Sequence, residues 1–298
     1  MQSYSLAFSR DSEHRLWLTF GIASVVTVIE LLGGISSHSL ALLSDSGHVF
    51  TDVLTIGVSI LTMRLARKPH SSTRTFGYHR AEILSALVNG STLTFIAFLI
   101  IYEAYGRLLQ PSQVAGSLVV LIALVGLAGN LAVARLFLKS WRSSLNVKAV
   151  FIHAIGDILS SSGVMIGGLV VTFTGYNRID PAIAILIGIL ILRNAYGLVR
   201  ESTEILLEST PKHLQLETVA KAILAVEGVN GIHDLHVWTI TSGLYAVSGH
   251  ITVKAETIDE GSRIISEVSS RLKNSFGIDH VTLQLERQTL EKIQSNEN

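Results

Sequence analysis

The chain has 298 residues, of which 48% are hydrophobic and 15% are charged, and its net charge at pH 7 is zero. Soluble domains carry about 25% charged residues, so this composition argues against an ordinary soluble protein, and the neutral balance provides no basic surface for nucleic acid. The absence of cysteine excludes disulfides, thiol catalysis and cysteine-ligated zinc, which leaves the eleven histidines as the available borderline metal ligands.

Six apolar runs are each long enough to cross a bilayer as a helix, which takes about 20 residues. In chain order they are residues 16–36, 40–65, 81–108, 116–138, 147–174 and 179–199. No small-residue cleavage site follows the first run, so we expect a retained helix rather than a signal peptide. Lys and Arg gather in the links 64–80 and 139–148 and are absent from 35–39 and 109–116. The positive-inside rule therefore predicts two cytoplasmic termini, and the short loops favour a bacterial cell membrane.

The composition changes near residue 206, which predicts a transmembrane domain over 1–205 and a cytoplasmic domain over 206–298. In the second part, residues 214–226 and 258–276 have helical spacing. Residues 233–241, 244–254 and 280–286 have the alternation of strands. The order α-β-β-α-β indicates a small α+β domain with its helices on one face of the sheet. A sheet this small usually needs a further partner surface, so we expect a homodimer.

Titratable residues interrupt two of the apolar runs at matching intervals. Asp45, His48 and Asp52 share one helical face of the second run, and His153 and Asp157 repeat the His-x-x-x-Asp spacing in the fifth. A charge inside a membrane costs about 2.5–3.5 kcal/mol, so such residues are functional by default. Two facing pairs would offer two imidazoles and two carboxylates, a tetrahedral set that suits Zn²⁺.

Other interpretations compete at individual positions. A single histidine in an apolar helix is more often a hydrogen-bonded core residue, which applies to His153 taken alone; the repeated pair favours a shared site. For Asp45, positioning of the helix or of a ligand competes with direct metal binding. Glu30, Asn89 and Asn130 are expected to bridge helices by hydrogen bonds.

A metal held by groups that must lose protons to bind it suggests a transport mechanism. Zn²⁺ displaces protons on binding, and its release on the other side allows reprotonation. With alternating access, we expect Zn²⁺/H⁺ antiport that expels zinc from the cytoplasm, while Cd²⁺, Co²⁺, Fe²⁺ and Mn²⁺ share some of these ligands. The alternatives are a membrane-embedded zinc metallohydrolase, for which we find no HExxH or comparable glutamate base, and a metal sensor, which would not need six helices.

Four motifs, LALLSDSGHVFTD, TFGYHRAEILSALVNG, NVKAVFIHAIGDILSS and IHDLHVWTITSG, resemble those of the cation diffusion facilitators, especially the bacterial zinc, cadmium and cobalt resistance branch. The resemblance covers nearly the whole chain. It implies a homodimer of six-helix subunits with cytoplasmic ferredoxin-like domains, acting as metal–proton antiporters. It places the transport site on His48, Asp52, His153 and Asp157, a set that in related transporters accompanies a zinc preference.

The resemblance also implies features outside the transport site. A regulatory zinc site in the cytoplasmic domain would use His233, His250 and Glu286, and the alternative there is a metal-free scaffold with a solvated polar face. A charge pair between Arg80 and Glu208 would tie the helices to that domain. The loop HSSTRTFGYHR departs from the Asp and His pattern with which some members bind a second ion, so we expect no metal site in it.

Overall fold

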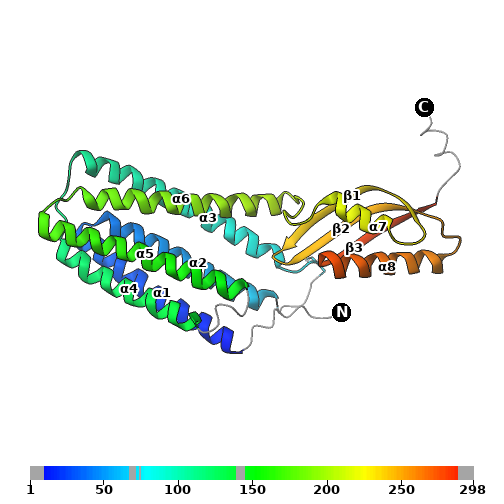
Figure 1. Ribbon diagram of the computed structural model, residues 1–298, viewed down its shortest axis with the longest axis horizontal. Coiled ribbons are helices and arrows are strands. Elements are labelled where there is room, and N and C mark those ends of the chain that lie inside the picture. The colour runs from blue at the N-terminus through cyan, green and yellow to red at the C-terminus, as the bar shows by residue number, and fades with distance from the viewer. Residues whose placement is uncertain (1–9, 67–71, 74, 139–144, 288–298) are drawn as a thin grey trace. The chain divides into compact units, whose positions relative to one another are not determined.

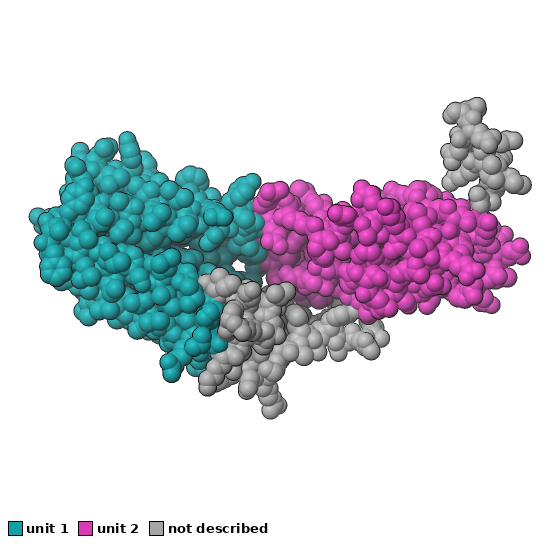
Figure 2. Space-filling view, in the orientation of Figure 1, with its two compact units in different colours: residues 1–67, 85–199 teal, residues 68–84, 200–298 magenta. Residues whose placement is uncertain are grey.

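The structure is a computed structural model of the chain that describes residues 10–66, 72–73, 75–138 and 145–287. Figure 2 shows two compact units, one made of residues 1–67 and 85–199, the other of residues 68–84 and 200–298. The second unit therefore contains the beginning of the third helix as well as the C-terminal part of the chain.

Six long helices account for the chain up to Leu206 in the described residues (Figure 1). They are α1 (Arg10–Ser37), α2 (Leu40–Ala66), α3 (His79–Leu109), α4 (Gly116–Leu138), α5 (Leu145–Thr174) and α6 (Ile179–Leu206). Each predicted apolar run lies in one of them, so the prediction of six long helices is confirmed. The ends differ most at α6, which continues to Leu206 rather than stopping at residue 199. Apolarity marks only the part of a helix suited to lipid, whereas the backbone hydrogen bonding continues through the polar residues that follow.

Five of these helices are long and apolar enough to cross a membrane: α1 from Trp17, α3, α4, α5 from His153, and α6. The chain is therefore a multi-pass membrane protein. The described part of α2, which contains Asp45, His48 and Asp52, is not among the five. It contacts α1 and α5, which both contact α4, so α1, α2, α4 and α5 form a closed group of four helices.

The beginning of α2 is held by the first turn of α6. Ser39 Oγ accepts a hydrogen bond from Leu42 N at 3.1 Å, as a helix N-cap does. The carboxylate of Asp180 accepts bonds from Leu40 N at 2.7 Å and from Ser39 Oγ. These contacts fix where α2 starts, and therefore the level at which its titratable residues lie. Buried apolar residues of α2, α3, α4, α5 and α6 form one cluster: Ala41, Leu42, Leu93, Ala97, Val119, Ala123, Val164, Ile187, Ile191 and Ala195.

The C-terminal elements of the second unit form a small α+β domain, called here the tail domain: α7 (Leu216–Leu224), β1 (Val229–Thr241), β2 (Leu244–Val253), α8 (Ile258–Phe276) and β3 (Ile278–Arg287). The predicted order α-β-β-α-β is confirmed. The sheet has the order β1-β2-β3, with β1 and β2 antiparallel and β2 and β3 parallel. Its core comprises residues of both helices and the sheet, including Val219, Ile223, Val247, Ile251, Val268 and Leu272.

Local signals in the sequence set the limits of α8. Thr257 is its N-cap, and Thr257 Oγ1 accepts a hydrogen bond from Glu260 N at 3.2 Å. Gly277 ends the helix in the left-handed conformation, at φ 67°, which glycine adopts without a Cβ clash. β3 begins at the next residue and returns parallel to β2, so the glycine determines where the last strand enters the sheet.

Candidate metal centre

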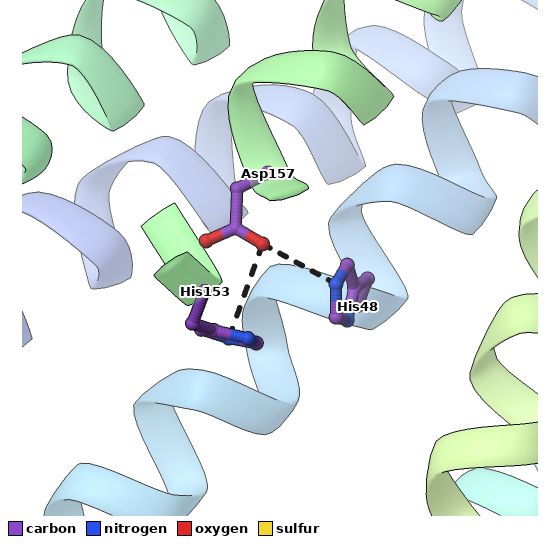
Figure 3. A group of neighbouring side chains, drawn as sticks. All are labelled: His48, His153 and Asp157. Carbon is purple, nitrogen blue, oxygen red and sulfur yellow. Dashed lines mark ion pairs between the residues drawn. The ribbon is translucent and has the colours of Figure 1, made fainter. Parts of the chain in front are cut away.

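Helices α2 and α5 bring three of the four predicted transport ligands into one group (Figure 3). His48 Nε2 lies 3.3 Å from Asp157 Oδ1, and His153 Nε2 lies 3.9 Å from the same oxygen. One ligand atom from each of these residues lies within 4.8 Å of the other two. The spacing of four residues within each helix, together with the α2–α5 contact, explains why the side chains converge.

The fourth predicted ligand, Asp52, lies at the edge of this group. Its Oδ1 is 2.7 Å from His153 Nε2, which is the distance of a hydrogen bond. Each histidine therefore faces a carboxylate of the opposite helix, His48 with Asp157 and His153 with Asp52. These pairs join α2 to α5 at two successive turns.

The distances suit a tetrahedral ion with small adjustments. Ligands at about 2.0–2.2 Å from Zn²⁺ in tetrahedral geometry lie roughly 3.4 Å from one another. The 3.3 Å and 3.9 Å separations at Asp157 bracket that value, whereas the 2.7 Å contact of His153 with Asp52 would have to lengthen by roughly 0.7 Å. Two imidazole nitrogens and two carboxylate oxygens are donors that zinc accepts.

The four side chains differ in how far they are buried. Asp157 is 10% exposed, His48 and Asp52 are each 19% exposed, and His153 is 47% exposed. The group is thus covered on the Asp157 side and more exposed on the His153 side.

Asp45, one turn before His48, is held by hydroxyl groups rather than left free to bind. Its Oδ1 accepts from Ser160 Oγ at 2.6 Å and its Oδ2 from Ser161 Oγ at 2.9 Å, and the residue is 1% exposed. With both oxygens bonded to α5, Asp45 is better placed to position the two helices than to hold metal. Sequence reasoning did not identify the two serines, although the run Ser160–Ser162 one turn after Asp157 was a signal for them.

Two of the three isolated polar residues bridge helices as expected. Asn130 Nδ2 donates to Ser161 Oγ at 3.1 Å, and Asn89 Nδ2 donates to Thr55 Oγ1 at 3.3 Å. The expectation is wrong for Glu30, which is fully buried and has no hydrogen-bond partner for either carboxylate oxygen among the described residues.

A second group of metal-ligand type lies on the sheet of the tail domain. His233 and His250 are opposite each other in the β1–β2 register, with ring centroids 5.1 Å apart. Glu286 on β3 reaches both, with Oε1 2.9 Å from His250 Nδ1 and Oε2 3.5 Å from His233 Nε2. One ligand atom of each lies within 4.8 Å of the others. Three residues far apart in sequence are thus adjacent because the strands align them.

A β-bulge adds an acidic residue to this group. The register of β1 shifts between His233 and His236, and Asp234 there adopts φ 50°, which is uncommon for a residue other than glycine. Asp234 Oδ2 lies 3.9 Å from His250 Nε2, and Asp234 Oδ1 lies 2.9 Å from His236 Nε2. Simple alternation along IHDLH does not predict this placement, because the bulge changes the face of the sheet on which each side chain lies.

The predicted pair of Arg80 and Glu208 forms an ion pair within the second unit, with Arg80 Nη2 2.7 Å from Glu208 Oε1. Its side chains are 41% and 56% exposed, and exposed pairs contribute about 0–1 kcal/mol. Nearby, Thr241 Oγ1 donates to Glu82 Oε2 at 2.8 Å, a contact that sequence reasoning did not anticipate. Of the loop expected to bind no metal, residues 70, 71 and 74 lie outside the described residues.

The sequence profile of the cation efflux transmembrane domain matches residues 16–207, and that of the cation efflux protein cytoplasmic domain matches residues 211–288. The chain belongs to the cation efflux family. The resemblance inferred from the four motifs is therefore confirmed, and membership favours a transporter over a hydrolase or an isolated sensor.

Bacterial relatives in the family match along most of their length. The cadmium, cobalt and zinc/H(+)-K(+) antiporter of Bacillus subtilis is 38% identical over 274 residues, 91% of this chain and 88% of that protein. The metal cation efflux system protein CzcD of Cupriavidus metallidurans is 36% identical, covering 92% and 87%. The zinc transporter ZitB of Pectobacterium atrosepticum is 34% identical, covering 92% and 85%. A solved metal-bound C-terminal domain of the C. metallidurans CzcD transporter is 37% identical over 24% of this chain and 99% of that one, with a TM-score of 0.23.

Proposed function

We propose that the protein exports Zn²⁺ from the cytoplasm in exchange for protons, using His48, Asp52, His153 and Asp157 as the transport site within the membrane. The observation that carries this proposal is the meeting of two His-x-x-x-Asp pairs from α2 and α5 around one point. Membership of the cation efflux family supports the direction of transport. Relatives named as zinc transporters and as a zinc/H(+)-K(+) antiporter support the cargo and the counter-ion.

The cross-helix pairs supply the coupling. Without metal, a proton held between His48 and Asp157, and another between His153 and Asp52, links each imidazole to its carboxylate. Zn²⁺ needs the same nitrogen lone pairs and carboxylate oxygens, so its arrival from the cytoplasm expels these protons there. When the site opens to the opposite face, protons bind again and the ion leaves. The inward proton gradient then drives zinc outward.

We assign the tail domain a regulatory role. His233, His250 and Glu286 would hold a resident zinc, since two imidazoles and a carboxylate fit that ion and already lie close together. The tail domain, together with the rest of residues 206–298, also serves as the dimerisation domain of a homodimer. Residues 1–205 form the membrane domain of each subunit, and the Arg80–Glu208 pair links the two domains.

The orientation follows from the distribution of basic residues. The links 64–80 and 139–148 hold most of the Lys and Arg between the apolar runs, which places these links and both termini in the cytoplasm of a bacterial cell membrane. On this orientation α2 completes six spans. Cd²⁺ and Co²⁺, which relatives carry in their names, and Fe²⁺ and Mn²⁺ share part of the donor set and are secondary cargo.

Zinc uptake into proteoliposomes under an imposed pH gradient tests the proposal. Wild type should accumulate zinc only with the gradient, and Asp157→Ala should abolish the flux. Glu103→Gln is the control, because Glu103 is also an acid of a long helix, α3, but is 55% exposed and pairs with Arg107 instead of facing the histidines. Flux in Asp157→Ala equal to that of the wild type would refute the four-ligand site, and gradient-independent flux in the wild type would refute antiport.

A further inference from the structure

The proposed transport site makes no use of Glu30, although Glu30 is a fully buried acid of α1. Glu30 lies in the C-terminal half of α1 and has no exposed surface. Neither of its carboxylate oxygens has a hydrogen-bond partner among the described residues. An ionised carboxylate in such a place loses its hydration without compensation, so a buried acid of this kind holds a proton instead. Asp180, also buried, accepts hydrogen bonds at both oxygens.

The surroundings of Glu30 are built to receive its carboxyl group. Gly126 of α4 leaves the space that Glu30 Oε1 occupies, and a Cβ at position 126 would collide with that oxygen. The same Cβ would lie 3.6 Å from Ser161 Oγ. The carboxyl group of Glu30 and the hydroxyl group of Ser161 therefore both lie beside Gly126. Ser161 in turn donates to Asp45 and accepts from Asn130. Glu30 therefore adjoins the polar cluster that positions α2 and α5.

The charges that act on Glu30 belong to the neighbouring helices. They are Asp45 on α2 and Asp157 on α5, while α4 contributes the uncharged Gly126. A divalent cation at the transport site would attract an ionised Glu30 carboxylate, and this attraction extends further in a poorly hydrated interior than in water. The charge state of Glu30 is thus linked to occupation of the site, although Glu30 is not among the ligands.

We propose that Glu30 carries one of the exchanged protons, separately from the four residues that hold the metal. Its carboxylic acid loses a proton to the cytoplasm when Zn²⁺ binds, and its carboxylate takes a proton from the opposite face when Zn²⁺ leaves. The proton count balances, since one O–H bond breaks on binding and one forms on release. This inference rests on the proposed antiport and adds to it a proton site that does not compete for the metal.

Isothermal titration of zinc into the purified full-length protein, repeated in buffers with different ionisation enthalpies, measures the protons released per zinc. Compared with the wild type, Glu30→Gln should release about one proton fewer per zinc and should bind zinc more weakly, because a proton whose release is linked to metal binding is coupled to the affinity for the metal. Glu30→Asp, which keeps an ionisable group, should restore the wild-type count. Glu103→Gln, which removes an exposed acid of α3, should release as many protons as the wild type. Zinc bound in the tail domain contributes equally to every variant, so the difference isolates Glu30.

Each result separates this inference from the proposed function. If wild type and Glu30→Gln release equal numbers of protons, the role of Glu30 is overturned and the antiport stands. If the Asp157→Ala variant binds zinc as the wild type does, both the role of Glu30 and the proposed antiport are overturned. Infrared difference spectra of the wild type provide a second test that does not depend on the folding of Glu30→Gln. Zinc should abolish the carbonyl stretch of a protonated carboxyl group. The frequency of this band should shift in Glu30→Asp, which assigns it to Glu30. A spectrum without that loss would overturn the inference.

Discussion

Removal of the His153 imidazole should weaken zinc binding at the transport site by about two orders of magnitude. Zinc sites with four ligands in small domains bind with about 10–16 kcal/mol at pH 7. An equal share for each ligand is then about 2.5–4 kcal/mol, which corresponds to a roughly 60- to 700-fold change in Kd. His153 is 47% exposed, the most of the four, so a water molecule can take its place on the ion. Because water can replace the imidazole, the increase in Kd expected for His153→Ala lies near the lower end of this range, at roughly 100-fold.

Competition with a chromophoric zinc chelator measures this change in the full-length protein. Both the parent and the variant should also carry His250→Ala, so that the cluster in the tail domain does not add to the signal. His213→Ala is a suitable control, because it also removes one imidazole but from a residue whose ring contacts Tyr245 in the second unit. A Kd for His153→Ala within a few-fold of its parent would refute the assignment of His153 as a ligand.

Three further outcomes are expected. Log Kd for zinc at the transport site should fall as pH rises, with a slope equal to the number of protons released; a pH-independent Kd would contradict displacement of protons from His48 and His153. His250→Ala should lower the zinc bound per chain, measured by elemental analysis, by the amount held in the tail domain. The gradient-driven zinc flux of this variant should still depend on Asp157. Leu272→Ala should destabilise the tail domain by about 2–5 kcal/mol, because Leu272 is fully buried in its core. Hydrogen exchange of the β2 amides would report this loss, and unchanged protection would argue against a single cooperative core.

The amino-acid sequence alone determines the local architecture of this protein. Apolar runs of about 20 residues can satisfy their backbone hydrogen bonds in lipid only as helices, so the positions of the long helices follow from composition. Within each helix, the spacing of His48 and Asp52, and of His153 and Asp157, places both members on one face. In the tail domain, Thr257 and Gly277 mark the ends of α8 by capping rules that act over a few residues.

Only the tertiary structure decides which side chains meet between elements. The pairing of His48 with Asp157, and of His153 with Asp52, depends on the contact of α2 with α5. The two hydrogen bonds that occupy Asp45 depend on the same contact. Asp234 joins the histidines of the sheet only because β1 has a bulge. The sequence shows Glu30 as one more polar residue in an apolar run. Only the packing of α1 against Gly126 shows that its carboxyl group is buried with no hydrogen-bond partner among the residues that the structure describes. Periodicity acts along one helix or strand, whereas burial and pairing depend on the neighbours that folding brings alongside it.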